Sequence, residues 1–406
     1  MTPKLRGSYR FVDADCGTVP VTSDDVQETE ETLQRAVQFG VLPPPWSTDL
    51  LHIARMVFVA DKRCDRRKAP DRWTRTIDLE VELIDPAPWR DRAGRIVLEL
   101  LTVLTGDRWR LDFRQTNESF EVQMGLFDEP VSEVVLFSGG LDSTAYGSKR
   151  SREREPLLFV TYQDFHLYEL QRRRLEKMSG GDGTRYVTTS QRVQEVQEWS
   201  SRSRGFLYVA TAIWAATARG ASRVCIPENG QLAVNPPLTP SRLGSCSTRS
   251  VHPYTLHLLN ELIACLGEQD LTVENPLWSM TKGEVCELAL QSGLSAEELA
   301  EETYSCGSHP ANTGGRDEHC GACVPCLLRR SGLHASSGGD RTRYKEPPER
   351  VRQHENVRAL EWWLNHEFGE RDIVADMPLP PGLSARSLLP VLERGRIEYR
   401  TMLASL

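Results

Sequence analysis

The residues with the clearest chemical potential form a short turn, Ser138-Gly139-Gly140-Leu141-Asp142-Ser143. An apolar run at 134–137 precedes this turn and Thr144-Ala145 follows it, a pattern that predicts a buried strand, a tight turn and the start of a helix. Backbone N–H groups and the positive end of the helix dipole would face the turn, and the glycines allow an anion to approach closely. We therefore expect a phosphate site. A Walker-type loop is excluded, because Leu141 stands where that loop needs a lysine.

A cysteine cluster forms the second candidate site, and its members are Cys306, Cys320, Cys323 and Cys326. Four thiolates at this spacing can surround one Zn²⁺ and leave no open coordination position, so the metal would be structural. A cysteine triplet could instead hold an iron–sulfur cluster with one open iron, but the fourth cysteine favours zinc. His309 and His319 are possible substitute ligands, although the four cysteines suffice.

The composition is that of a soluble globular protein, with 39% hydrophobic and 26% charged residues in a chain of 406, long enough for two or three domains. No run approaches the ~20 apolar residues of a membrane span, and the first residues lack the apolar core of a signal peptide. We expect a cytoplasmic protein with no membrane partner and no disulfide framework among its ten cysteines. The net charge of −8 gives no general attraction to nucleic acid, so nucleic acid is not expected as a partner.

From residue 131 onward, predicted strands alternate with predicted helices, which favours an α/β domain with a parallel sheet. The strands are predicted at 134–137, 157–162, 186–189 and 221–226, and the helices at 167–175 and 206–219. Ligands of such sheets bind at the carboxyl ends of the strands. The phosphate turn, the segment from Tyr162 to His166, and Glu228-Asn229 all follow strand ends, so we expect them to meet in one crevice, covered by a loop at 235–250.

The flanking segments predict two further units. Residues 1–130 predict a small α+β accessory domain, with helices at 24–39, 49–63 and 95–105 and strands at 76–84 and 108–114. Thr281 and Glu284 form a capping box that opens a helix, to which we assign no chemistry. Helices are also predicted at 254–266, 356–368 and 385–403. The predicted domains are 1–130, 131–345 with the cysteine site, and a helical extension at 346–406.

Several motifs occur in a telling order: SGGLDS, H-x-x-E at His166 and Glu169, the segment from Arg204 to Phe206, T-x-S-C at Thr303 to Cys306, and C-G-x-C-x-x-C-x-x-R ending at Arg329. This order resembles the 7-cyano-7-deazaguanine synthase (QueC) family of PP-loop ATP pyrophosphatases over residues 131–335. The resemblance implies an adenine nucleotide alpha-hydrolase-like fold and a zinc site at the four cysteines. It also implies that ATP activates 7-carboxy-7-deazaguanine, that ammonia gives the amide, and that a second ATP drives dehydration to the nitrile.

The sequence also departs from ordinary members of that family. The family string Y-G-Q-R-H reads Y-Q-D-F-H here, and ordinary members lack both flanking units. The stretch at 227–253 looks more like the long QueC-like proteins of anti-phage defence operons, the QatC type or the CBASS-associated relative. This similarity implies the same activation chemistry but a second possible product. That product is a deazaguanine conjugate with the α-amine of a protein encoded in the same operon.

We expect the cradle of ATP to comprise Ser138, Gly139, Gly140, Leu141, Asp142, Ser143 and Thr144. Within it, Ser138, Asp142 and Ser143 would be catalytic, with Asp142 reaching Mg²⁺. The candidate substrate-binding residues are Tyr162, His166, Glu169, Arg204, Phe206, Glu228, Asn229, Arg242, Arg249 and His252, since an arginine fork suits a carboxylate. Two other classes remain open: a PP-loop enzyme that thiolates tRNA, and a nucleotide-binding scaffold of a defence complex.

Overall fold

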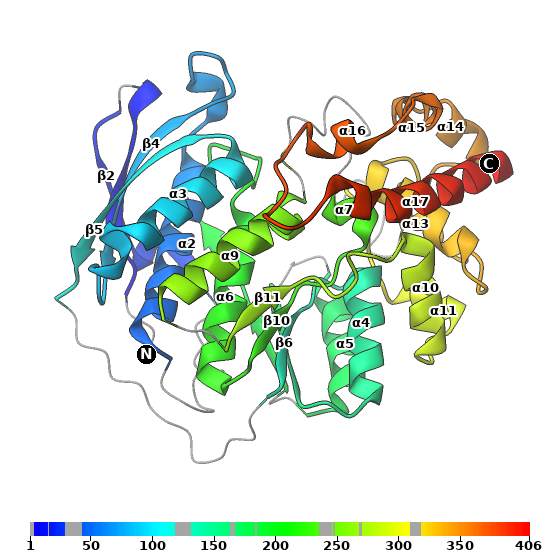
Figure 1. Cartoon of the computed structure of the whole chain (residues 1–406), viewed down its shortest axis with the longest axis horizontal. Helices are drawn as coiled ribbons and strands as arrows, with labels where there is room; N and C mark the ends of the chain where they lie inside the picture. Colours follow the sequence, from blue (N-terminus) through cyan, green and yellow to red (C-terminus); the bar gives the residue numbers. More distant parts are fainter. Residues whose placement is uncertain are drawn as a thin grey trace.

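The computed structural model describes residues 4–14, 16–28, 43–117, 131–162, 167–182, 185–234, 246, 248–267, 270–308 and 318–406. Three β-sheets are present in this part of the chain, two large and one of two strands, and helices surround the two large sheets (Figure 1). One large sheet belongs to the N-terminal unit and the other to the middle of the chain. The helices that follow residue 320 pack against helices that flank this second sheet.

The central sheet has five strands in the order β11-β10-β6-β7-β8, and every neighbouring pair is parallel. Their bounds are β6 Glu133–Leu136, β7 Leu157–Tyr162, β8 Tyr186–Thr189, β10 Arg223–Cys225 and β11 Thr272–Glu274. The predicted α/β class with a parallel sheet is confirmed, and this architecture is consistent with a PP-loop domain. β11 was not predicted, because three residues carry too little periodicity.

Helices cover both faces of this sheet, which explains why its inner strands are hydrophobic without alternation. Val134 and Val160 pack with helix α6 (Arg204–Arg219), whereas Val135 and Phe159 pack with helices α4 (Leu141–Arg152) and α5 (Tyr168–Ser179). Successive side chains of a strand point to opposite faces, so each strand serves both layers. The helices concerned are α4 Leu141–Arg152, α5 Tyr168–Ser179, α6 Arg204–Arg219, α9 Pro253–Cys265, α10 Lys282–Gln291 and α11 Ala296–Glu301.

The N-terminal unit contains a four-stranded sheet in the order β2-β1-β4-β5. Its strands are β1 Arg6–Phe11, β2 Val19–Thr22, β4 Thr76–Leu83 and β5 Arg108–Gln115, and its helices are α2 Pro45–Arg63 and α3 Arg92–Thr105. β4 buries every second residue, as its alternation predicts. The predicted helices at 49–63 and 95–105 and the predicted strands at 76–84 and 108–114 are therefore confirmed.

One prediction in this unit is wrong. The start of the helix predicted at 24–39 is instead a 3₁₀ turn, η2 Ser23–Asp25, followed by β3 Val26–Glu28. β3 pairs antiparallel with β9 Gln191–Val193 of the central domain, and this long-range pairing outweighs the local helical spacing. Residues 29–39 lie outside the described residues.

A buried charge network joins the N-terminal unit to the central domain. Asp61 of α2 accepts hydrogen bonds from Arg75 Nη2 over 2.5 Å and from Ser203 Oγ over 2.7 Å. Asp107 accepts from Arg75 and from Arg66, and all four charged side chains are buried. Ser203 is the residue before α6, whose first residue is Arg204. The accessory unit therefore fixes the start of α6.

Replacing Asp61 with asparagine should destabilise the protein by about 3–5 kcal/mol, because Arg75 would lose a buried partner. Urea unfolding measures this difference. The exposed Asp112→Asn variant is the control and should stay within about 0.5 kcal/mol of the wild type. Equal stability of Asp61→Asn and the control would show that the network does not hold the two units together.

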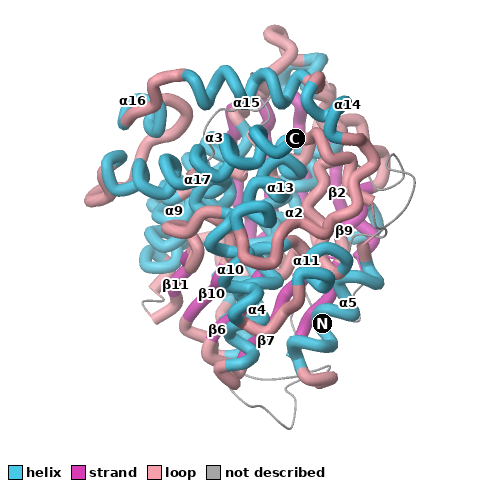
Figure 2. The backbone as a smooth tube through the Cα atoms, turned by 90° about the vertical axis from the view of Figure 1, so that its right-hand side faces the viewer, coloured by secondary structure: helices cyan, strands magenta, loops and turns pink. Residues whose placement is uncertain are grey.

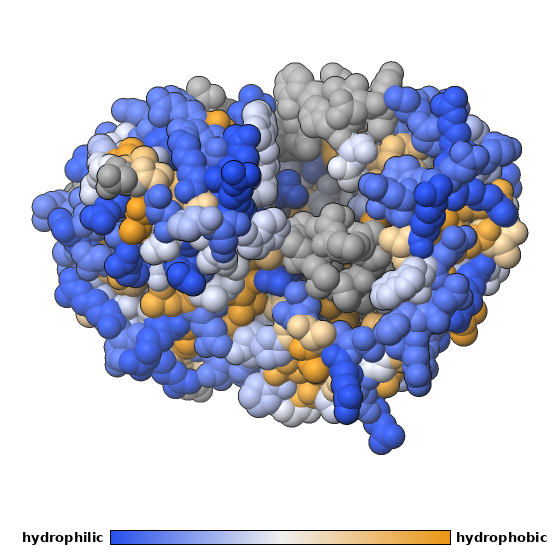
Figure 3. Space-filling model, turned by 90° about the horizontal axis from the view of Figure 1, so that it is seen from above, coloured by the Kyte–Doolittle hydropathy of each residue, from blue (hydrophilic) through white to orange (hydrophobic). Residues whose placement is uncertain are grey.

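The described helices after residue 320 are α13 Val324–Ala335, α14 Pro348–Arg352, α15 Glu355–Asn365, α16 Glu370–Val374 and α17 Ala385–Ser405, which confirms helices near 356–368 and 385–403. Figure 2 shows α17 crossing in front of α13 and above α10. Hydrophilic side chains cover most of the described surface seen from above (Figure 3). No helix within the described ranges combines the length and the apolar character that a membrane crossing requires.

Candidate active site

The predicted phosphate turn lies between β6 and α4, at the carboxyl end of the central strand. Gly139 has a φ of +81°, a left-handed conformation that other residues rarely adopt. Two serine side chains close the turn: the Ser138 N–H donates to Ser143 Oγ over 3.3 Å, and the Gly140 N–H donates to Ser138 Oγ over 3.2 Å. The predicted strand–turn–helix arrangement is confirmed, and it directs the start of α4 toward the turn.

Asp142, in the first turn of α4, is only 5% exposed. Its Oδ1 accepts a hydrogen bond from Lys282 Nζ over 2.8 Å, and its Oδ2 accepts one from Asn229 Nδ2 over 2.8 Å. Burial alone would raise the pKa of Asp142, but the Lys282 ammonium and the hydrogen bonds from Glu228, Lys282 and Asn229 together lower this pKa below its usual range. Burial would likewise lower the pKa of Lys282, but the Asp142 carboxylate raises it. Both groups are therefore charged at neutral pH.

Glu228, which follows β10, is the second carboxyl group of the site. Asn229 Nδ2 donates to Glu228 Oε1 over 3.0 Å, so one amide bridges the two carboxyl groups. Burial raises the pKa of Glu228 well above its usual range, and the negative charge of Asp142 raises it further. Asp142 is thus ionised while Glu228 holds a proton. Neighbouring groups with such separated pKa values are typical of functional sites.

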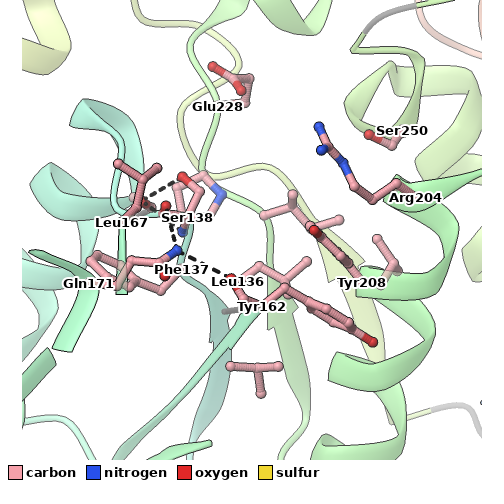
Figure 4. A pocket seen from close by; sticks show the side chains of 16 residues that line it. Leu136, Phe137, Ser138, Tyr162, Leu167, Gln171, Arg204, Tyr208, Glu228 and Ser250 are labelled. Atoms are coloured by element: carbon pink, nitrogen blue, oxygen red, sulfur yellow. Dashed lines mark hydrogen bonds between the residues drawn. The ribbon is translucent and has the colours of Figure 1, made fainter. Parts of the chain in front are cut away.

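A cavity of about 260 Å³ opens beside the turn. Its walls come from the carboxyl ends of β6, β7 and β10 and from the start of α6, as expected for an open α/β sheet. Figure 4 shows Ser138 and Gln171 on one side of this cavity, Arg204 and Ser250 on another, and Glu228 apart from both. A small polar molecule that enters here therefore meets the phosphate turn, a neutral carboxyl group and a guanidinium.

One wall of the cavity suits a flat ring system. The rings of Tyr162 and Tyr208 stack with centroids 3.9 Å apart and planes 17° apart. The Arg204 guanidinium carbon lies 5.9 Å from the centroid of the Tyr208 ring. Aromatic faces bind planar heterocycles, and an arginine fork binds a carboxylate. The cavity can therefore accept a planar molecule that carries a carboxylate.

The structure brings together only some of the predicted substrate residues. Tyr162, Arg204 and Glu228 line the cavity, and Asn229 lies behind Glu228. His166 and Arg242 fall outside the described residues, as does His309. Of the predicted loop at 235–250, only residues 246 and 248–250 are described.

The remaining predicted residues point elsewhere. Phe206 is 2% exposed and belongs to the hydrophobic core. Glu169 pairs with Arg172 on the outer face of α5. Arg249 pairs with Asp376 over 2.7 Å and donates to a backbone oxygen of α3. His252 caps α9 through Nδ1, and burial lowers its pKa to about 4. None of these four side chains lines the cavity. Each is instead packed in the core, paired with a charged residue, or bound to the end of a helix.

Lys282, Tyr208 and Gln171 were missed by the sequence analysis. Lys282 is the first residue of α10, directly after the capping threonine. A lysine at this position opposes the helix dipole, and that local conflict was an available signal of function. Tyr208 lies four residues after Arg204 on α6, which places both on one helix face. Gln171 donates to the backbone oxygen of Ser138 over 3.0 Å, and no motif marks it.

The four predicted cysteines form one cluster, and their Sγ atoms all lie within 4.8 Å of one another. Cys306 Sγ lies 3.9 Å from Cys323 Sγ, and Cys320 Sγ lies 3.8 Å from Cys326 Sγ. A tetrahedral zinc ion with four thiolates separates its sulfur atoms by about 3.8 Å. The residues present therefore fit a single structural zinc ion. His319 is not needed, because its Nε2 accepts the Ser305 N–H.

This cysteine knuckle, of which residues 303–308 and 318–326 are described, contacts the phosphate turn. The Tyr304 N–H donates to the Gly139 oxygen over 2.9 Å. Arg329 of α13 is fully buried and donates to Thr303 Oγ1 over 2.9 Å and to Ser305 Oγ over 3.3 Å. The segment that carries the first cysteine is thus fixed on both sides of Tyr304. Loss of order in the knuckle would therefore also disturb the phosphate turn, because the Tyr304 N–H binds the Gly139 oxygen.

Comparisons with known proteins agree with this arrangement. Residues 251–337 match the family model described as "Queuosine biosynthesis protein QueC". The chain is 26% identical over 238 residues to a 7-cyano-7-deazaguanine synthase of Agrobacterium fabrum, an alignment that covers 53% of this chain and 92% of that protein. It is 27% identical over 143 residues to the synthase of Porphyromonas gingivalis, covering 35% of this chain and 54% of that relative. Part of the chain thus resembles QueC, and the chain is distantly similar to 7-cyano-7-deazaguanine synthases.

Proposed function

We propose that this protein uses ATP to adenylate the carboxylate of 7-carboxy-7-deazaguanine and transfers the activated acyl group to an amine. The observation that carries the proposal is the buried Lys282–Asp142 pair at the base of the phosphate turn, next to a cavity with an aromatic and arginine wall. Glycine turns at helix N-termini bind phosphates, and a fixed ammonium group neutralises their charge. The similarity to 7-cyano-7-deazaguanine synthases supplies the substrate class.

In the proposed reaction, a carboxylate oxygen of the substrate attacks the α-phosphorus of ATP. The bond to the β-phosphate oxygen breaks, pyrophosphate leaves, and an acyl-adenylate forms. Arg204 would hold the carboxylate while the tyrosine pair stacks on the bicyclic ring. Glu228 holds a proton and can donate a hydrogen bond into the cavity. Catalysis would come mainly from positioning and charge neutralisation.

Mg²⁺ is the usual companion of ATP, and the residues present fit it. Asp142 and Glu228 present neighbouring carboxyl groups, and Glu228 holds a proton that a cation would displace. These two residues would hold the ion, which would supply positive charge beside the phosphates. Asp142 Oδ2 accepts hydrogen bonds from both the side-chain and the backbone N–H groups of Asn229, so Oδ1 is the oxygen that would reach the ion.

The amine decides the product. Ammonia would displace AMP to give the amide, and a second ATP would drive dehydration to the nitrile. A protein α-amine would displace AMP to give a deazaguanine–protein conjugate, which is the outcome we propose for a role in anti-phage defence. In both cases the amine forms the C–N bond, AMP is the leaving group, and the amine loses a proton.

Mass spectrometry of one set of incubations tests the proposal. The full chain is mixed with ATP, Mg²⁺ and 7-carboxy-7-deazaguanine, with either ammonium or a protein encoded beside it. AMP together with a nitrile supports synthesis, and AMP together with a protein mass increase supports conjugation. The absence of AMP in both incubations would overturn the proposed adenylation.

The four-thiolate geometry argues against the tRNA-thiolating alternative. A multi-iron cluster holds its cysteines farther apart than a single ion does, because iron and sulfide lie between them. Metal analysis that finds zinc without iron would support the ligase. The scaffold alternative predicts nucleotide binding without turnover, so the AMP measurement also tests it.

Replacing Arg204 with alanine should raise the KM for 7-carboxy-7-deazaguanine roughly 10- to 100-fold, the effect of one charge-assisted hydrogen bond. The KM for ATP should stay the same, because Arg204 lies across the cavity from the phosphate turn. Steady-state AMP formation measures both constants. The exposed Arg173→Ala variant is the matched control. An unchanged KM for 7-carboxy-7-deazaguanine would show that Arg204 does not bind the substrate.

A further inference from the structure

One face of helix α17 lies against the segments that supply both partners of Asp142. The residues on this face are Val391, Arg394, Gly395 and Glu398, at the spacing i, i+3, i+4 and i+7 that aligns side chains along a helix. In Figure 1, α17 runs beside α7 and α13, with α10 below them. Its neighbour α7 (Gly230–Ala233) directly follows Asn229. Its other neighbour, α10, begins with Lys282.

Two side chains of α17 hold the start of α10. The Glu398 carboxylate accepts hydrogen bonds from the Thr281 hydroxyl and from the Gly283 N–H, the latter over 3.1 Å. Arg394 donates to Glu284 Oε1 over 2.6 Å and to the Ser279 oxygen over 2.8 Å. Lys282 lies between the two groups that Glu398 binds. Its backbone therefore has little freedom while α17 is in place.

The same helix also packs closely on α7. A Cβ atom built on Gly395 would lie 2.4 Å from Gln231 Nε2, so the two helices approach as far as a glycine permits. Gln231 Oε1 in turn accepts the Lys282 N–H over 2.8 Å. A Cβ atom built on Gly230 would lie 2.8 Å from Val391 Cγ2. Helix α17 thus contacts both elements whose side chains bind Asp142.

We propose that Glu398 is a positioning residue of the candidate active site, which holds the first turn of α10 so that the Lys282 ammonium meets Asp142. The inference rests on the proposed adenylation, and it adds a functional group from α17, outside the region that matches the QueC family model. The physical basis is the pair of hydrogen bonds that Glu398 makes on either side of Lys282. The free N–H groups of a helix's first turn need acceptors, and the Glu398 carboxyl group accepts the Gly283 N–H while it also binds the Thr281 hydroxyl.

Steady-state AMP formation by the full chain tests the proposal with three variants. Glu398→Ala should lower kcat roughly 10- to 100-fold, the effect of a small displacement of a catalytic group. The KM for 7-carboxy-7-deazaguanine should not change, because Arg204, Tyr162 and Tyr208 lie on α6 and β7, whereas Glu398 binds the start of α10. Glu398→Gln should recover most of the rate, because its amide can accept the Gly283 N–H and donate to Thr281.

The exposed Glu393→Gln variant, on the same helix, is the control and should match the wild type. A kcat of Glu398→Ala within twofold of the wild type would overturn the proposal. An equal rise of KM with the loss of rate would also overturn it, because that result indicates a general distortion of the cavity rather than a displaced Lys282.

Amide hydrogen exchange separates this inference from the proposed function. Exchange at Lys282 and Gly283 should be at least roughly tenfold faster in Glu398→Ala than in the wild type or Glu393→Gln, because the Gly283 N–H loses its side-chain acceptor. A wild-type protein that forms no AMP would refute the adenylation, and the exchange data would still test the hold of Glu398 on α10. Unchanged exchange in Glu398→Ala would overturn the positioning role whatever the reaction.

Discussion

Replacing Lys282 with methionine should lower the rate of AMP formation by about 10²- to 10³-fold, the usual effect of removing one fixed electrostatic group from an active site. Lys282 Nζ is the cation beside Asp142, at 2.8 Å, and it lies at the base of the phosphate turn. Single-turnover formation of AMP from ATP and 7-carboxy-7-deazaguanine measures the effect. The Lys177→Met variant, an exposed lysine on α5, should keep the wild-type rate.

Loss of Lys282 also leaves the buried Asp142 carboxylate without its charged partner, which should cost about 3–5 kcal/mol of stability. A double variant, Lys282→Met with Asp142→Asn, removes both charges and should recover much of that stability without recovering activity. Thermal unfolding and AMP formation are therefore measured together for the single and double variants. A double variant that is both stable and active would exclude the pair from catalysis.

Removal of the knuckle metal should abolish AMP formation and lower the unfolding temperature. Structural zinc contributes apparent binding energies of about 10–16 kcal/mol in small domains, comparable with the whole stability of a typical protein. The loss should reach the active site because the Tyr304 N–H binds the Gly139 oxygen in the phosphate turn. Metal analysis should find one zinc ion per chain, and chelation followed by added Zn²⁺ should restore both properties.

Cysteine variants show whether the effect comes from the knuckle. Cys320→Ser should reproduce the chelated protein, whereas Cys16→Ser, at an exposed cysteine far along the chain from the cluster, should behave as the wild type. Full activity of a metal-free Cys320→Ser protein would show that the contact between Tyr304 and Gly139 does not depend on the metal. Iron in place of zinc would reopen the thiolation hypothesis.

Features that depend on neighbouring residues could be predicted from the sequence. The alternation of Ile77, Leu79, Val81 and Leu83 predicted strand β4, and the glycine turn after an apolar run predicted the junction of β6 and α4. The spacing of the cysteines predicted a cluster that can hold one metal ion. In each case a side chain's position follows from its own element, because the periods of strands and helices are fixed by backbone geometry.

The tertiary structure decided which residues complete the candidate site. Lys282 and Asp142 lie 140 residues apart in the chain, and the sequence assigned the surroundings of Lys282 only to helix capping. Phe206 belongs to a motif by sequence, but its position on α6 turns it into the core, whereas Tyr208 on the same helix faces the cavity.

The sequence by itself determined a phosphate turn, a parallel α/β domain and a four-cysteine cluster, because these depend on local spacing. The partners of Asp142 and the hydrogen bonds between α17 and α10 depend on how distant elements pack. Local periodicity does not predict that packing. Glu398 shows the difference most clearly: in the sequence it is one of many charged residues in a helix, and in the fold its carboxylate binds the turn that presents Lys282.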